Sequence, residues 1–189
     1  MPDIIRTFIA AEMPKNIISG VGELQQGLKD YGIDIRWIRP ENIHLTLKFL
    51  GDVQAADIGN IFGAISRTVD GIASISLNAK GIGVFPGLSR PRVLWVGLAG
   101  QLEVLLQLQK TLDSNLKAIG FPQEKRPFKG HLTIGRIKTK INAKKFGDAL
   151  MAFRNFETET FIADKIILFK SELKPQGAVY TRLASAPLG

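Results

Sequence analysis

A short motif of histidine, leucine, threonine and an aliphatic residue occurs twice in this chain and constrains its fold more than any other feature. The copies cover residues 44–47 and 131–134, and they contain the only two histidines of the 189-residue sequence. Strict alternation of polar and apolar residues predicts a half-buried β-strand, in which side chains at i and i+2 share a face. Each copy is therefore expected to present its histidine and threonine on one side and to bury its aliphatic residues on the other.

The repetition has a purely structural explanation and a catalytic one. A lone histidine on a strand is more often a packed or surface residue than a catalytic one, and a repeated unit also repeats its packing residues. Packing explains the aliphatic positions, but not the histidine and threonine that share the opposite face in both copies. If the two strands face each other, two imidazoles and two hydroxyls converge on one cleft. Because imidazole titrates near neutrality, such a pair can supply a base and an acid together.

Composition limits the class of protein. A chain of this length forms one domain or a tight pair of lobes around a substantial core. The sequence has no cysteine, no apolar run long enough to span a membrane and no signal peptide at its N-terminus. We therefore expect a cytoplasmic protein without disulfides or thiolate metal sites. The net charge of +8 favours a polyanionic partner, although a basic soluble protein would carry the same charge.

Hydrophobic periodicity predicts an alternation of strands and helices. Strands are expected at residues 4–11, 33–38, 43–50, 73–84, 92–98, 161–170 and 177–184, and at the second motif. Helices are expected at residues 14–30, 55–69, 102–119 and 142–154, the last capped by Asn142. Strand, helix, motif strand and helix thus follow one another twice. This order predicts an α+β protein, one domain over residues 1–189, with two similar lobes, mainly antiparallel sheets, helices outside and a central cleft that carries both motifs.

Long segments around the motifs resemble the two-histidine (2H) phosphoesterase superfamily. Within it, the chain is most similar to the bacterial and archaeal RNA 2′,3′-cyclic phosphodiesterases of the LigT type, a group also called 2′-5′ RNA ligases. The resemblance covers almost the whole chain through residues 6–10, 37–51, 84–86, 91–95, 127–136, 171–175, 177 and 180. One departure is Lys129-Gly130, where the family has a proline at the second position. The glycine adds backbone freedom and leaves the motif residues in place.

The resemblance implies hydrolysis of RNA 2′,3′-cyclic phosphate ends to 2′-phosphomonoesters, with no metal or other cofactor. It implies that His44 donates a proton to the leaving ribose 3′-oxygen and that His131 accepts a proton from water. The residues alone leave these two roles open, because the motifs are nearly symmetric. The hydroxyls of Thr46 and Thr133 can donate to non-bridging phosphate oxygens. We expect a monomer that binds RNA ends or small cyclic nucleotides and uses no membrane.

Two cations near the motifs are further candidates for phosphate contact. Lys48 follows His44 by four positions, so strand parity predicts it on the histidine face, as a contact at the rim of the cleft. Arg136 matches a family arginine. Parity puts it on the opposite face unless the strand bends at Gly135.

Three residues farther from the motifs complete the candidate site. Arg92 lies at a loop edge, where it is either a phosphate contact or a solvated charge. Phe85, beside a loop proline, is a candidate to stack on a base, as aromatic side chains do with single-stranded RNA. Phe8 is a second candidate, with core packing as the stronger alternative.

Other functions fit the sequence less well. Two histidines without cysteines or a carboxylate cluster leave zinc short of its usual protein ligands, and no Gly-x-x-x-x-Gly-Lys-Ser/Thr loop supports ATP-driven ligation. A non-catalytic RNA-binding module would bind the same phosphate without turnover. ATP-independent, reversible 2′-5′ RNA ligation would use the same site in reverse and would need adjacent RNA ends. Fragments of tRNA, other RNA ends and small cyclic nucleotides all present the same phosphate, so the natural substrate stays open.

Overall fold

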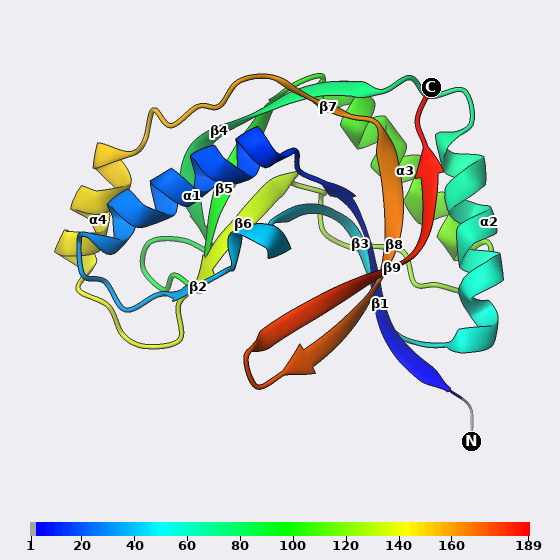
Figure 1. Cartoon of the computed structure of the whole chain (residues 1–189), viewed down its shortest axis with the longest axis horizontal. Coiled ribbons are helices and arrows are strands. Elements are labelled where there is room, and N and C mark those ends of the chain that lie inside the picture. Colours follow the sequence, from blue (N-terminus) through cyan, green and yellow to red (C-terminus); the bar gives the residue numbers. More distant parts are fainter. Residues whose placement is uncertain (1–2) are drawn as a thin grey trace.

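The computed structural model describes residues 3–189 and confirms an α+β fold built on an antiparallel sheet (Figure 1). The strands are β1 (Ile4–Glu12), β2 (Arg36–Trp37), β3 (His44–Gln54), β4 (Ile75–Phe85), β5 (Val93–Gly100), β6 (His131–Arg136), β7 (Phe161–Ala163), β8 (Lys165–Lys174) and β9 (Gly177–Pro187). The helices are α1 (Lys15–Lys29), α2 (Ile58–Val69), α3 (Leu102–Lys117) and α4 (Ala143–Ala152), with short 3₁₀ turns η1 (Pro40–Asn42) and η2 (Ala55–Asp57). No helix among residues 3–189 is long and apolar enough to cross a membrane.

The sheet divides into two lobes where the motif strands meet. Its strand order is β7-β4-β5-β6-β3-β1-β8-β9, and β2 adds to β6. Strands β3 and β6 share one ladder pair in the described chain, Leu45 with Leu132. We call β1, β3, β8 and β9 the first lobe, and β2, β4, β5, β6 and β7 the second. Because the lobes join at this pair, the two histidine motifs lie at the centre of the molecule.

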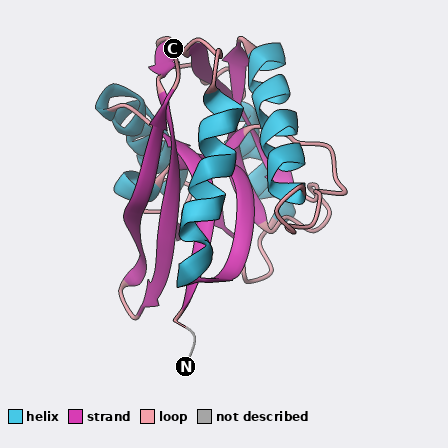
Figure 2. Ribbon diagram, turned by 90° about the vertical axis from the view of Figure 1, so that its right-hand side faces the viewer, coloured by secondary structure: helices cyan, strands magenta, loops and turns pink. Residues whose placement is uncertain are grey.

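Helices cover the outside of each lobe. Helices α2 and α3 lie beside the first lobe, whereas α1 and α4 lie over the second (Figure 1). Figure 2 is turned so that the α2–α3 side faces the viewer and shows helices in front of the strands. The apolar residues that recur at helical spacing are the buried ones, as predicted: in α1 they are Ile17, Val21, Leu24 and Leu28.

Two of the helices pack on the lobe that does not contain the strand preceding them. Helix α1 follows β1 of the first lobe, yet its Gln25 side chain donates hydrogen bonds to the carbonyls of Ile38 (2.8 Å) and Ile134 (2.9 Å), next to β2 and in β6. Helix α3 follows β5 of the second lobe, yet its Asp113 pairs with Lys48 of β3. Each of these two helices therefore binds to the lobe opposite to the preceding strand, and α3 also contacts β4 of the second lobe.

The core joins the lobes. A continuous cluster of buried apolar side chains includes Leu45 and Leu132 at the junction, both with no exposed surface. A smaller cluster of Phe8, Ala10, Ile167 and Phe169 is separate from it, and Tyr180 packs against this cluster. The first lobe thus has an aromatic wall of its own.

Two predicted strands differ from the structure. The strand predicted at residues 161–170 is interrupted at Asp164, because β7 pairs with β4 of the second lobe and β8 pairs with β1 of the first. The chain changes lobes at that residue. The strand predicted at residues 33–38 is reduced to β2, which pairs only at Arg36 and Trp37 among the described residues. The predicted cap of α4 is confirmed, since the Asn142 side chain accepts a hydrogen bond from the Lys145 amide (3.0 Å).

Candidate active site

Each histidine is held by the carbonyl oxygen two residues before it. His44 Nδ1 lies 2.7 Å from the Asn42 oxygen, and His131 Nδ1 lies 2.7 Å from the Lys129 oxygen. A carbonyl oxygen only accepts hydrogen bonds, so Nδ1 carries the hydrogen in both rings. The Nε2 atom of each ring is then left to take up or release a proton. Two side chains from different lobes are thus prepared identically for proton transfer.

The register of the motif strands brings the four polar motif residues together. Since β3 and β6 run antiparallel and pair at Leu45 and Leu132, His44 lies across from Thr133, and Thr46 across from His131. All four are partly exposed, whereas the leucines between them are buried. The charge of His131 also acts on the pKa of His44. The structure therefore places two imidazoles and two hydroxyls on one face at the junction of the lobes.

Both motif strands contain a β-bulge at the fourth motif residue. In β3, Ile9 and Ala10 of β1 pair with Lys48 and Thr46, so Leu47 is the extra residue. In β6, the extra residue is Ile134, between the positions paired with Leu94 and Trp95. A bulge shifts the alternation of faces by one residue. The residues that follow the motifs are therefore turned to the faces opposite to those that strict alternation predicts.

The first bulge overturns one prediction. Lys48 does not share the face of His44: it is 7% exposed, and its Nζ lies 2.5 Å from Asp113 Oδ1 and 2.8 Å from the Pro122 carbonyl oxygen. The prediction that Lys48 lies on the histidine face, at the rim of the cleft, is wrong, because parity counting did not include the bulge. The exposed residue at this point is Phe49, which lines the groove beside the motifs.

The second bulge supplies the bend on which Arg136 depends. After Ile134, Gly135 is buried, and a Cβ atom there would lie 2.6 Å from Ile35 Cγ2. Arg136 is exposed and lines the same groove as Phe8 and Tyr180. The strand thus turns this arginine toward the cleft.

Aromatic rings flank both histidines. In the first lobe, the ring of Phe8 lies 4.8 Å and that of Tyr180 5.3 Å from the His44 ring. Phe8 is also stacked on Phe169 at 5.2 Å and is 3% exposed, so it belongs to the packed aromatic wall. Tyr180 was not predicted as a neighbour of the histidines, because the pairing of β9 beside β8 has no signal in the local sequence.

In the second lobe, Phe85 and Trp95 lie near His131, with ring centroids at 5.0 and 6.4 Å. The Lys129 ammonium lies 4.5 Å from the Trp95 ring centroid and 5.4 Å from that of Phe85, which is cation–π geometry. Phe85 is partly exposed and therefore accessible, unlike Phe8. Trp95 was missed as a site residue, although it pairs with Thr133 in the sheet.

Burial sets the electrostatics of the first histidine. Desolvation lowers the pKa of His44 below 6.5; the hydrogen bond to Asn42 opposes this effect, and the charge of His131 adds to it. Burial also raises the pKa of the Tyr180 hydroxyl, with Arg136 acting in the opposite direction. At neutral pH, His44 is consequently neutral in the free protein, and Tyr180 keeps its proton as a hydrogen-bond donor.

Arg92 lies outside the groove. It lines a separate cavity of about 320 Å³, together with Arg90, Lys138 and Lys140, between the loops that follow β4 and β6. Arg92 immediately precedes β5 and is not among the described residues that line the two cavities at the motifs, so the structure does not bring it together with the histidines.

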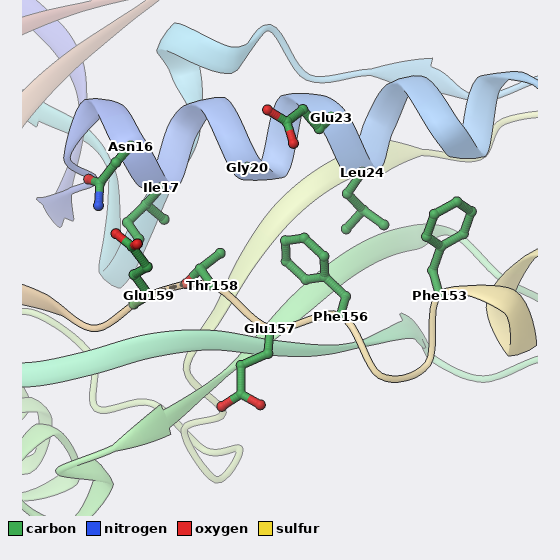
Figure 3. A pocket seen from close by; sticks show the side chains of 10 residues that line it. All are labelled: Asn16, Ile17, Gly20, Glu23, Leu24, Phe153, Phe156, Glu157, Thr158 and Glu159. Atoms are coloured by element: carbon green, nitrogen blue, oxygen red, sulfur yellow. Dashed lines mark hydrogen bonds between the residues drawn. The ribbon is translucent and has the colours of Figure 1, made fainter.

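Three more cavities differ in the charges that line them, two beside the motifs and one elsewhere on the surface. A groove of about 340 Å³ runs beside them and contains four arginines, Arg6, Arg36, Arg39 and Arg136. A cavity of about 400 Å³ borders His44. A third, of about 390 Å³, lies between α1 and residues 153–159 and carries Glu23, Glu157 and Glu159 (Figure 3). Carboxylates repel phosphate, so this third cavity does not suit an anionic substrate, whereas the arginine-lined groove beside the motifs does. Residues 3–189 contain no group of three histidine, cysteine or acidic side chains placed to hold a metal ion.

The chain matches the family model described as LigT like Phosphoesterase twice, at residues 12–95 and 96–180. A relative from Methanocaldococcus jannaschii, named RNA 2′,3′-cyclic phosphodiesterase, is 34% identical over 176 residues, which are 93% of this chain and 96% of the relative. A relative of the same name from Methanothermobacter thermautotrophicus is 32% identical over 177 residues, 94% of this chain and 95% of the relative. A solved structure from Thermus thermophilus superposes with a TM-score of 0.79 at 25% identity and covers 97% of this chain and 98% of its own.

Proposed function

Because the chain belongs to the LigT-like phosphoesterase family, we propose that it hydrolyses RNA 2′,3′-cyclic phosphodiester ends to 2′-phosphomonoesters at the two motifs. The curated relatives at 32–34% identity bear the name of this activity. The observation that carries the proposal is the pair of histidines with identical Nδ1–carbonyl hydrogen bonds on one face of the sheet. Such a pair supplies both proton transfers of the reaction.

The reaction breaks one bond and forms one. Water attacks phosphorus, and the bond from phosphorus to the ribose 3′-oxygen breaks. His131 Nε2 takes the proton from water as the new bond to phosphorus forms, and His44 Nε2 gives a proton to the departing 3′-oxygen. Thr46 and Thr133 donate hydrogen bonds to the non-bridging oxygens, and Arg136, in the neighbouring groove, adds positive potential near the phosphate. Both histidines come from one chain, which supports catalysis by a monomer.

The assignment of acid and base is the finer part of the proposal. Burial lowers the pKa of His44, so in the free protein this ring is neutral at pH 7. A general acid must be protonated when the substrate is bound. An anionic phosphate between the rings favours the charged imidazole and raises its pKa again. The proposed roles therefore require that His44 becomes protonated when the substrate binds.

Turnover of a 2′,3′-cyclic nucleotide tests the function. We expect a 2′-phosphomonoester as product, with activity that survives exhaustive chelation, because the proposed acid and base need no Lewis acid. A protein that binds the nucleotide without turnover would be a binding module instead. Formation of 2′-5′ linkages from RNA ends without ATP would show that the site also runs in reverse.

The pH dependence of kcat/KM tests the roles. Two interacting imidazoles titrate as a coupled pair, and their base and acid forms should give a bell-shaped profile. With an activated cyclic substrate that keeps a residual rate measurable, His131→Ala should flatten the acidic limb and His44→Ala the basic limb. The opposite result would reverse the roles and keep the chemistry, whereas a wild-type profile without limbs would contradict paired-histidine catalysis.

A further inference from the structure

Two arginines face each other directly across the β2–β6 pair. Arg36 and Arg136 are ladder partners, and both side chains are exposed. Partners in an antiparallel pair project to the same face of the sheet, and like charges in this position destabilise it. A short two-residue strand that carries this repulsion is poorly explained by folding alone. An anion between the two guanidinium groups would turn the repulsion into a binding contribution.

A third arginine extends this pair, and the groove around it has no counter-charge. Arg39, from the turn after β2, lies in the groove with Arg36 and Arg136 and donates a hydrogen bond to the Gln176 carbonyl of the β8–β9 turn (2.5 Å). No Asp or Glu is among the described residues that line the groove. Across residues 3–189, none of the three arginines forms an ion pair with a carboxylate.

A neighbouring arginine shows that the protein neutralises such charges elsewhere. Arg182, in the cavity that borders His44, makes two hydrogen bonds to the Glu12 carboxylate, at 2.8 and 2.7 Å. Among the described residues, Arg36, Arg39 and Arg136 differ from it in that their one side-chain hydrogen-bond partner is the carbonyl that Arg39 binds. Arg6, at the far end, is the ladder partner of Asp52, so the positive potential that attracts anions comes from the other three arginines.

The arginines lie close to the motif strand β6, beside the expected position of the reacting phosphate. Arg136 follows Thr133 by three residues on β6, at most about 10 Å along the strand. The groove also includes Phe8 and Tyr180, whose rings contact that of His44. A nucleotide whose cyclic phosphate lies between the histidines can therefore extend its 5′ side toward the arginines. Phe49, 66% exposed in the same groove, offers an aromatic surface for a base.

We propose that Arg36, Arg39 and Arg136 form a clamp for the phosphate on the 5′ side of the terminal nucleotide. Guanidinium groups bind phosphate oxygens in a bidentate manner, which suits a diester as well as a terminal phosphate. The clamp makes oligonucleotide ends better substrates than free cyclic mononucleotides. This inference rests on the proposed function, because it takes the histidines as the site of the cyclic phosphate.

Binding of two product analogues tests the clamp without any turnover. Adenosine 2′,5′-bisphosphate carries the extra 5′-phosphate that adenosine 2′-phosphate lacks. We expect calorimetry to give a Kd about tenfold lower for the bisphosphate with the wild type. Arg36→Gln should reduce this ratio to near one, whereas Arg67→Gln, on α2 outside the groove, should leave it unchanged. Rising salt should also reduce the ratio. An equal ratio in the wild type and Arg36→Gln would overturn the clamp.

Turnover of matched substrates separates the clamp from the function itself. Adenosine 2′,3′-cyclic phosphate and its 5′-phosphorylated form are compared by kcat/KM. The 5′-phosphate should raise kcat/KM about tenfold in the wild type and in Arg67→Gln, but not in Arg36→Gln. Turnover of both substrates at equal rates would refute the clamp and uphold the proposed function. If the wild type hydrolyses neither substrate, the proposed function fails, and the binding ratio still decides the clamp.

Discussion

His44 and His131 make the same hydrogen bond to the carbonyl two residues earlier, but the walls around them differ. His44 lies against Phe8 and Tyr180, and burial lowers its pKa. His131 lies beside Phe85 in a more open setting, where the Lys129 ammonium covers the neighbouring rings. The comparison teaches that the repeated backbone orients both rings in the same way, whereas the surrounding side chains differ and those of the first lobe bury His44 and lower its pKa.

The positions just after the motifs sharpen the contrast. Counted from the histidine, the fifth residue of both strands is buried by the bulge. This residue is Lys48, with an ion partner, in β3 and Gly135 in β6. The sixth residue returns to the groove, as Phe49 in one strand and Arg136 in the other. Equal geometry thus delivers an aromatic surface from one lobe and a cation from the other.

Removing either histidine is the strongest test of the shared geometry. We expect His44→Ala and His131→Ala each to lower kcat/KM by about 10²–10⁴-fold, because in the proposed mechanism each ring carries one proton transfer. Melting curves should show that both variants stay folded, and affinity for RNA should persist. Near-normal turnover of either pure variant would contradict the proposal that both histidines take part in catalysis.

The fifth position tests whether Lys48 is structural. Lys48→Met leaves Asp113 buried without its cationic partner, so the free energy of unfolding in urea should fall by about 3–5 kcal/mol. The double variant Lys48→Met/Asp113→Leu should recover part of the loss, because it also removes the acceptor of the Glu124 amide. At a temperature where the protein is folded, kcat/KM of the double variant should match the wild type. A tenfold decrease in kcat/KM of the double variant would instead indicate that Lys48 contacts the phosphate.

The threonines test how far the symmetry extends into catalysis. Thr46→Val and Thr133→Val each remove one donor to the phosphate, and we expect kcat to fall by about 10²-fold in both. Thr68→Val, on α2, is the control for loss of a threonine hydroxyl away from the motifs; this hydroxyl donates to the Ala64 carbonyl and accepts from the Asn115 amide of α3. Strongly unequal effects would show that a single lobe holds the non-bridging oxygens.

The lowered pKa of His44 predicts a pH effect on stability. The unfolded chain binds a proton near pH 6.5, whereas folded His44 resists it, so the unfolded state holds more protons below that pH. The free energy of unfolding should therefore decrease as the pH falls from 6.5, and less so in His44→Gln. In NMR, the His44 ring signal should titrate below 6.5 and shift upward when adenosine 2′-phosphate binds. The same pH dependence in both proteins would contradict the buried setting.

The smallest effect concerns the paired arginines. If Arg36 and Arg136 repel each other in the free protein, Arg36→Gln should raise the free energy of unfolding by about 0.2–1 kcal/mol in low salt. The gain should disappear in high salt, since both charges are exposed. Arg67→Gln should show no such salt-dependent gain. Destabilisation by Arg36→Gln would mean that the two charges are compensated in the folded protein.

The sequence contains the signals for what depends on local periodicity. Alternation in residues 44–47 and 131–134 predicted the face of each histidine, and Asn142 predicted the start of α4. Gly32 and Gly120 have positive φ angles just after α1 and α3, near the predicted helix ends.

What could not be predicted depends on partners far along the chain. A bulge adds one residue opposite a neighbouring strand, so the turned side chains of Lys48 and Arg136 depend on β1 and β5 rather than on their own sequence. Asp113 lies 65 residues beyond Lys48, and no local pattern links them. The interruption at Asp164 likewise depends on which lobe each side of it joins.

The crossing of α1 and α3 has a consequence for how the chain holds together. The segments matched separately by the family, residues 12–95 and 96–180, are not the two lobes: β4 of the first segment pairs in the second lobe, and β8 of the second segment pairs in the first. Neither segment completes a lobe alone, and one apolar core runs through both lobes. The two lobes therefore form one cooperative unit rather than two domains that unfold in turn.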